Sequence, residues 1–172
     1  IDVSLYQYGV WGLNIDTSAV LVQGEELHQT ERKKVSNPLW NTYQTRDGVW
    51  VQIMCLQSDR YWPQFCEGLG IDHLRNHPKF DSHQKREQNN IELISIIESA
   101  ISSKSYAELE DSFTRAGEVI FGRIQTPSEV VNDNQALVNN FFPEVMYPSG
   151  QKIRLVASPA QFSGTPASIR TT

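Results

Sequence analysis

The sequence predicts an α+β fold in which antiparallel β-hairpins pack with helices, preceded by an apolar N-terminal helix. Asp47-Gly48 stands between two segments with strand-like patterns, and Pro148-Ser149-Gly150 separates a second such pair. Between these two turns, apolar residues recur at helical spacing over several segments. Strands joined by tight turns are antiparallel neighbours, so this order predicts hairpins with helices packed against one face.

The N-terminal segment predicts one helix that begins at Ser4 and runs to about Val22. Its apolar residues are Leu5, Tyr8, Val10, Trp11, Leu13, Ala19 and Leu21. This apolar content is high for a surface helix, so we expect the helix to pack on another domain or a partner chain. The polar residues 23–36 are typical of a linker.

The first hairpin and the helix after it are signalled locally. Apolar side chains alternate along residues 49–55, which is the period of a strand with one apolar face. Asp47-Gly48 predicts a two-residue turn before this strand. A helix is expected over residues 59–69, with Ser58 or Asp59 as its N-cap.

The middle of the chain predicts a connection and two helices. Residues 72–88 are rich in His and Asn and read as an irregular connection. Helices are expected over residues 90–103 and 105–116. The second of these opens with a capping box, formed by Ser105 and Glu108.

The last third predicts shorter elements. Residues 119–124 indicate a short strand, and Thr126 with Glu129 forms a second capping box that opens a brief helix. A second hairpin is expected from residues 141–147 and 151–157.

The composition is that of an ordinary globular chain. With 172 residues and 39% hydrophobic residues, the chain can bury one core. A net charge of −5 argues against nucleic acid or an anionic membrane as a partner. No apolar run approaches the roughly 20 residues needed to span a bilayer, and no signal peptide is seen. We therefore expect a cytoplasmic protein in which Cys55 and Cys66 are reduced core thiols.

Several motifs, in order along most of the chain, resemble the small domain of family III CoA-transferases, the carnitine–CoA and formyl-CoA transferase group. They are the run NPLWNTYQTRDGVWVQIMCLQSDRYWPQFCEGLG at 37–70, HPKF at 77–80, Arg86 with Asn90, QTPSEV at 125–130 and SP with FSGTP at 158–166. The resemblance implies residues 1–36 as a helix and linker from the large domain, 37–166 as the small α+β domain and 167–172 as a tail.

The resemblance also implies a reaction. Such enzymes use a carboxylate nucleophile that attacks an acyl-CoA thioester, and CoA then passes to a second carboxylate. Coenzyme A thioester is thus a substrate, and no permanently bound cofactor is expected. The nucleophilic Asp of the family lies upstream of the position matching Ile1, so we expect no catalytic residue here. The small domain is expected to cap the thioester site and to aid dimerisation, giving a homo-oligomer.

One loop is the candidate for a substrate-proximal site. It consists of Asn37, Pro38, Leu39, Trp40 and Asn41. By position it resembles the glycine-rich loop that closes over the thioester in formyl-CoA transferases. No glycine occurs in it, so two interpretations stay open: a lid, or a Trp40 that fills the seam between domains.

Other residues with catalytic potential are assigned structural roles. Asp47 belongs to a turn, Asp59 to a helix start, and Glu108 and Glu129 to capping boxes. Three histidines could coordinate zinc, namely His73, His77 and His83. However, His77 stands where the family usually has an Asp in a structural turn. Surface histidines and no metal site are therefore expected.

Two alternatives to a transferase domain remain. The chain could be a catalytically silent, truncated relative that serves as a binding or assembly module. A less favoured alternative is part of an acyl-CoA racemase, in which a Glu lies close to the position of Gln57-Ser58-Asp59. In each case the 172-residue chain alone is expected to be inactive.

Overall fold

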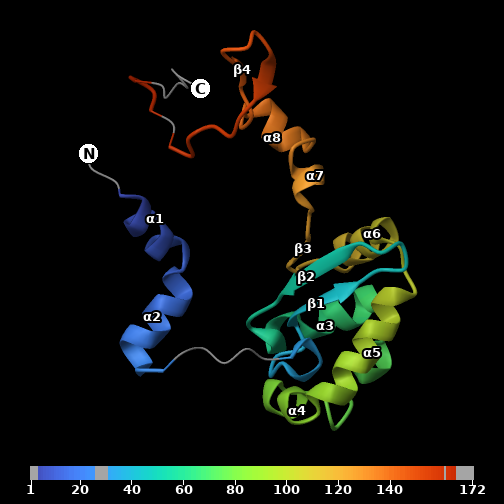
Figure 1. Cartoon of the computed structure of the whole chain (residues 1–172). Helices are drawn as coiled ribbons and strands as arrows, with labels where there is room; N and C mark the ends of the chain where they lie inside the picture. Colours follow the sequence, from blue (N-terminus) through green and yellow to red (C-terminus); the bar gives the residue numbers. More distant parts are fainter. Residues whose placement is uncertain (1–3, 26–30, 161, 166–172) are drawn as a thin grey trace.

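The computed structural model describes residues 4–25, 31–160 and 162–165. Figure 1 colours the chain from the N-terminal helices, through a body of mixed helices and strands, to a short C-terminal hairpin. The predicted tail at 167–172 lies outside the described residues. The helices and antiparallel strands confirm the predicted α+β class.

The body is built on a three-stranded antiparallel sheet. Its strands are β1 (Trp40–Gln44), β2 (Trp50–Met54) and β3 (Phe121–Arg123), in the order β1-β2-β3. Trp40 pairs with Met54, and Gln52 pairs with Gly122. The register alternates buried and accessible side chains along β1 and β2, as the apolar alternation predicts.

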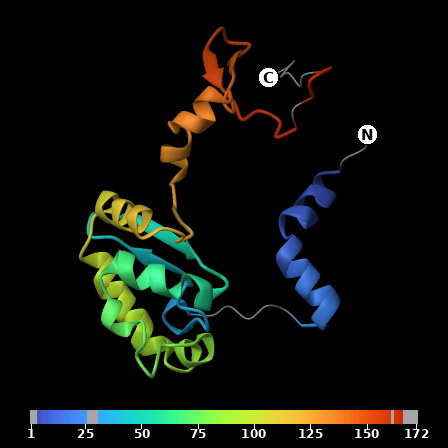
Figure 2. The same ribbon diagram turned by 180° about the vertical axis from the view of Figure 1, so that it is seen from behind.

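Helices cover one face of this sheet, as Figures 1 and 2 show from opposite sides. They are α3 (Ser58–Leu69), α5 (Asn90–Ser102) and α6 (Tyr106–Ala116). The fully buried side chains between them and the sheet include Tyr43, Val51, Ile53, Cys55, Phe65, Leu93, Ile97, Leu109 and Phe113. Burying a large aliphatic or aromatic side chain is worth about 1.5–3 kcal/mol, so this layer holds the body together.

The crossing of α3 and α6 depends on a glycine. A Cβ atom built on Gly68 would lie 2.5 Å from Cδ1 of Phe113. The two helices can therefore approach this closely only because residue 68 has no side chain.

The first hairpin differs in detail from its prediction. Residues 45–49 join β1 to β2, and only Gly48 among them has a positive φ, at 81°. Thr45 N–H donates to the Val49 carbonyl, and Gly48 N–H donates to the Thr45 carbonyl. The prediction of a two-residue turn is thus wrong. The Asp47 carboxylate instead accepts from the Thr45 hydroxyl and from Tyr106 N–H, which ties the turn to the start of α6.

The start of α3 also differs from its prediction. The helix begins at Ser58, and its N-cap, Gln57, makes no side-chain capping bond. Neither Ser58 nor Asp59 caps it, because both are engaged by Arg86. Gly70, with φ of 74°, ends the helix as expected.

The connection at 72–88 contains two helices that the sequence did not predict. They are η2 (Asp72–Leu74) and α4 (His83–Gln88), which is capped by the Ser82 hydroxyl. The described α4 buries Arg86 alone, so the hydrophobic periodicity that would have revealed it is missing.

The N-terminal segment forms two short helices instead of one. They are α1 (Leu5–Gly12) and α2 (Asn14–Gln23), separated at Leu13. The poor helix formers Gly12 and Asn14 flank the break. Ser4 caps α1 as predicted. Within the expected linker, η1 (Arg32–Lys34) forms a single turn.

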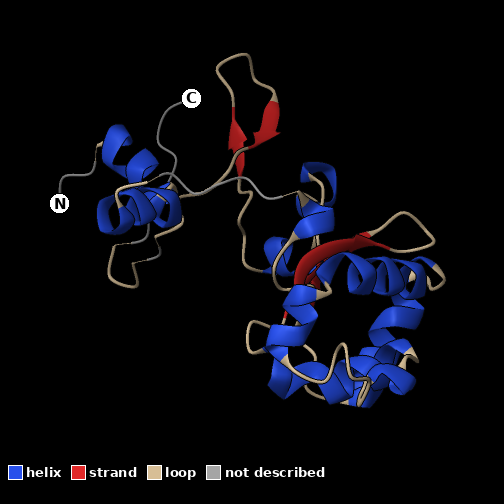
Figure 3. Ribbon diagram, turned by 90° about the horizontal axis from the view of Figure 1, so that it is seen from below, coloured by secondary structure: helices blue, strands red, loops and turns tan. Residues whose placement is uncertain are grey.

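The C-terminal segment carries the second hairpin, drawn in red apart from the body's sheet in Figure 3. Its strands are β4 (Glu144–Met146) and β5 (Lys152–Arg154), which pair antiparallel as predicted. Two short helices precede them, α7 (Pro127–Val130) and α8 (Asn134–Val138). The Thr126 capping box that opens α7 is present, whereas α8 was not predicted.

Candidate functional site

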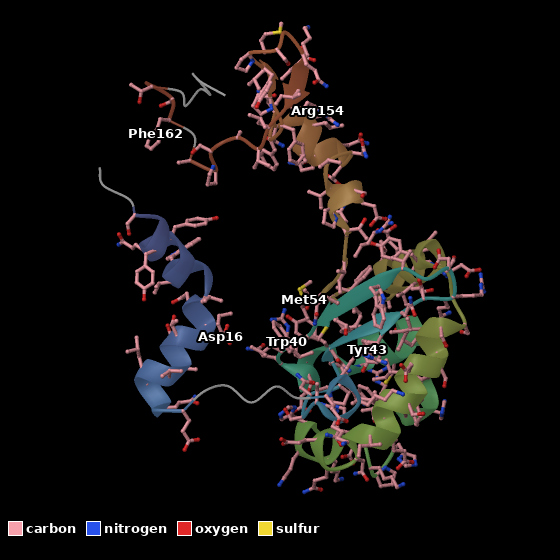
Figure 4. All side chains as sticks on the ribbon, viewed as in Figure 1. Asp16, Trp40, Tyr43, Met54, Arg154 and Phe162 are labelled. Carbon is pink, nitrogen blue, oxygen red and sulfur yellow. The ribbon has the colours of Figure 1, made fainter. Side chains whose placement is uncertain are left out.

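The sheet face opposite α3, α5 and α6 is open, and we call it the outer sheet face. Met54 N–H donates to the Ile120 carbonyl and Ile124 N–H donates to the Trp50 carbonyl, which extends the β2–β3 register by one residue each way. The outer sheet face consists of Trp40, Thr42, Gln44, Trp50, Gln52, Met54, Ile120, Gly122 and Ile124. Figure 4 labels Trp40 and Met54, which are direct partners on it.

The predicted substrate-proximal loop is anchored to the body. Asn37 Oδ1 accepts from Leu39 N–H at 3.0 Å, and its Nδ2 donates to the carbonyls of Cys55 and Leu56 at 3.4 Å each. Leu39 is fully buried. The Pro38 carbonyl accepts from the hydroxyl of Tyr43 at 2.8 Å. This segment is therefore part of the core packing.

Asn41 also points inward, and Trp40 does not. Asn41 is 5% exposed, and its Nδ2 donates to the Arg32 carbonyl at 2.9 Å. Burial raises the pKa of Tyr43, so its hydroxyl stays protonated as the donor to Pro38. Trp40 is 48% exposed at the start of β1. The structure thus brings four of the five predicted residues into packing roles and presents the fifth on the outer sheet face.

An arginine closes the edge of the sheet beside β1. Arg32 Nη2 lies 2.5 Å from Glu98 Oε1, and Nη1 donates to the Thr42 carbonyl at 3.2 Å. Its guanidinium lies 5.5 Å from the centre of the Trp50 ring, within cation–π range. Neither Trp50 nor Arg32 was a predicted site residue. The alternation along residues 49–55 was the signal that could have placed Trp50 on the open face.

A second polar cluster centres on Arg86, which is 1% exposed. It donates to the Phe80 carbonyl at 2.7 Å, to Ser58 Oγ at 3.0 Å and to the Asp59 carboxylate. Its guanidinium lies 4.8 Å from the centre of the Trp62 ring. Burial lowers the pKa of Arg86, and the Asp59 carboxylate opposes that shift. Asp59 is thus the counter-ion of a structural arginine.

Three other carboxylates have the structural roles that the sequence assigned. Glu108 and Glu129 complete capping boxes at the starts of α6 and α7. Backbone N–H donors lower their pKa values, that of Ser105 for Glu108 and that of Thr126 for Glu129. The Thr45 hydroxyl lowers the pKa of Asp47. Each of these groups is held ionised by its structural partners.

His77 and His83 have structural partners. His77 Nδ1 accepts from Lys79 N–H at 3.2 Å, and its ring stacks on Phe80 with centroids 5.2 Å apart. His77 thus accepts within a turn that its own carbonyl closes by accepting from Phe80 N–H at 2.8 Å. His83 Nδ1 lies 2.8 Å from Ser58 Oγ. Within the described ranges, no three His, Cys, Asp or Glu residues gather as a metal site.

The two cysteines lie in the core of the body. Cys55 and Cys66 are free and buried, and burial raises the pKa of Cys66 to about 12. These are the reduced core thiols that the sequence predicts, and a raised pKa keeps such a thiol unreactive. In the part of the chain that the structure describes, no helix has the length and apolar content needed to cross a bilayer.

Sequence comparison identifies the family. The model of the family described as CoA-transferase family III matches residues 1–172, so the chain belongs to this family. It is 24% identical over 162 residues to (R)-2-hydroxy-4-methylpentanoate CoA-transferase from Clostridioides difficile, covering 94% of this chain and 40% of that protein. It is 26% identical over 164 residues to cinnamoyl-CoA:phenyllactate CoA-transferase from Clostridium sporogenes, with the same coverage.

Solved structures share the fold. A CAIB/BAIF family protein from Brucella suis matches with a TM-score of 0.71 and 22% identity, over 93% of this chain and 40% of that one. Rv3272 from Mycobacterium tuberculosis matches with a TM-score of 0.68 and 21% identity, over 98% and 43%. The chain spans 40% of the length of each of the two curated relatives named above.

Proposed function

We propose that this chain supplies the small-domain portion of an acyl-CoA:carboxylate CoA-transferase, with Trp40 beside the thioester end of the substrate. Family membership over the whole chain supports this proposal. Residues 1–36 then belong with the large domain and 37–166 form the small domain. The nucleophilic carboxylate belongs to the portion of the enzyme that these 172 residues do not span.

The observation that carries the proposal is the fixed presentation of Trp40. Its neighbours Leu39 and Asn41 are buried, and the backbone N–H of Trp40 donates to the Asn37 carbonyl at 2.9 Å. With the backbone at Trp40 anchored in this way, the segment serves as a wall and not as a lid. A rigid apolar wall excludes water from a reactive acyl intermediate, which favours transfer to the carboxylate over hydrolysis.

The N-terminal helices favour association as the second part of the proposal. They expose Tyr6, Trp11, Ile15, Leu21 and Val22, each at 71–85%. Contiguous exposed apolar side chains mark interaction sites. We therefore assign α1 and α2 to the contact with the large domain or the second subunit of a cytoplasmic homodimer.

The proposal is tested by binding and turnover in the 172-residue chain. We expect no CoA transfer with a panel of acyl-CoA donors and carboxylate acceptors, because the nucleophile is missing. Acyl-CoA is nevertheless expected to quench indole fluorescence weakly. Trp40→Phe should abolish this response, and Trp11→Phe, on α1, should leave it intact.

Two results would contradict this assignment. Turnover above background that is lost when one carboxylate within residues 1–172 is changed would place the active site inside the chain. A fluorescence response that survives Trp40→Phe would place the thioester elsewhere on the surface.

A further inference from the structure

The outer sheet face is arranged in three rows that cross the strands. Trp40, Met54 and Ile120 lie side by side and form what we call the first row. Thr42, Gln52 and Gly122 form the middle row, and Gln44, Trp50 and Ile124 form the last row. Each row has one member from or beside each strand, so neighbours within a row are in contact range.

The first row is apolar, and solvent reaches it. Trp40 is 48% exposed, Ile120 is 44% exposed, and Met54 is half-buried. A Cβ built on Gly122 would lie 3.5 Å from the Met54 methyl group, so the Met54 side chain extends along the sheet above this glycine. A flexible thioether next to a fixed indole can adapt to hydrocarbon groups of different shape.

The outer sheet face has no charged side chain among its nine members. Arg32 lies near the last row, over Trp50, but its charge is already paired with Glu98 at 2.5 Å and its Nη1 is bonded to the Thr42 carbonyl. Among the nine members and Arg32, a carboxylate placed on the first row would therefore find no free cation to offset its loss of hydration. Burying an unpaired charge is strongly unfavourable.

We propose that the first row selects CoA thioesters with an apolar acyl group and discriminates against acyl groups that end in a carboxylate. The inference rests on the proposed function, since it assumes that the thioester lies beside Trp40. It adds the substrate class and two selecting residues, Met54 and Ile120. Burial of a methylene is worth about 0.8 kcal/mol, so a branched hydrocarbon end gains where a carboxylate loses.

The test compares two matched thioesters on the 172-residue chain. 4-Methylpentanoyl-CoA and succinyl-CoA have acyl groups of similar length and shape, in which an isopropyl group replaces a carboxylate. CoA itself reports the contribution of the nucleotide portion. Dissociation constants come from backbone amide NMR titrations, which also locate the binding at residues 37–41. We expect 4-methylpentanoyl-CoA to bind about tenfold more tightly than succinyl-CoA.

Matched charge variants assign the preference to the first row. Met54→Lys places a cation within the row and should reverse the preference, and Ile120→Lys should do the same from β3. Ile124→Lys adds the same charge at an equally exposed position in the last row and should keep the wild-type ratio. Circular dichroism checks that each variant is folded. If one of the two first-row variants fails to fold, the other still tests the inference.

The outcomes separate this inference from the proposed function. If both thioesters shift residues 37–41 with equal affinity, the substrate class is wrong and the site stands. If Ile124→Lys reverses the preference and Met54→Lys does not, selection belongs to the other row. If neither thioester shifts residues 37–41 while CoA also fails to do so, the site beside Trp40 is wrong and both proposals are overturned.

Discussion

Neutralising Asp59 should destabilise the body only moderately, because the Asp59 side chain is largely exposed to solvent. Asp59→Asn removes the counter-ion of Arg86, whose side chain is 1% exposed, while that of Asp59 is 66% exposed. Breaking a fully buried pair costs about 3–5 kcal/mol. Because water screens the Asp59 side, we expect a loss of only about 1–2 kcal/mol in the free energy of unfolding.

Removing the arginine should cost more than removing its partner. Arg86→Ala deletes the bonds to the Phe80 carbonyl and to Ser58, together with the stacking on Trp62. It also leaves a void in a close-packed region, so we expect a loss of about 3–5 kcal/mol. Arg86→Lys retains a charge but not the forked donor geometry, and should fall between the two substitutions.

Urea unfolding followed by circular dichroism measures these differences, provided that the slope with urea is unchanged. Asp111→Asn is the matched control, since Asp111 pairs with Arg115 across one helical turn and both side chains are exposed. That change should stay within about 0.5 kcal/mol. If Asp59→Asn is as small as the control, or as large as Arg86→Ala, the reasoning from burial is refuted.

Three further predictions follow from particular positions. Gly68→Ala should cost about 1–3 kcal/mol, because its Cβ would meet an aromatic ring of α6 at 2.5 Å, whereas Gly9→Ala, with open space around it, should not lower the unfolding midpoint. Because the pKa of Glu108 is lowered in the folded state, its capping contribution to stability is present above the ordinary pKa of 4.5 and is lost as pH falls through the lower folded value. Glu108→Gln should therefore make the free energy of unfolding depend less on pH on the acid side. An unchanged dependence on pH would contradict this. Leu21→Ser, at a side chain 85% exposed, should lower the association of the chain measured by light scattering; a wild-type chain that is already monomeric would count against the interface.

The sequence predicted the elements whose signals are local. The capping boxes at Ser105 and Thr126 fix where α6 and α7 begin, because each needs only residues within one turn. Gly70 likewise ends α3 through its own φ. The N-cap of α3 was missed for a non-local reason. Ser58 could have been an N-cap, but Arg86, far along the chain, engages its hydroxyl.

The candidate site shows the same division. Asn37 and Asn41 have the polar side chains expected of residues near a substrate. Their actual partners are backbone carbonyls of Cys55, Leu56 and Arg32, which no local pattern could reveal. Whether an asparagine faces solvent or the core is decided by packing between distant segments. The sequence therefore proposed the segment as a whole, and only the structure separates the exposed Trp40 from its buried neighbours.

Three of the motifs that carry the family resemblance meet in one structural cluster. Asp59 and Trp62 come from the run at 37–70, and Phe80 comes from the HPKF step; all three contact Arg86, the residue of the next motif. Asn90, the last residue of that motif, donates to the Val35 carbonyl and ties α5 to the segment before β1. These contacts link α3 to α4, and α5 to the segment before β1. These motif residues therefore support the scaffold of the body, whereas Met54 and Ile120, which we propose as selecting residues, make no contact with Arg86 among those described here.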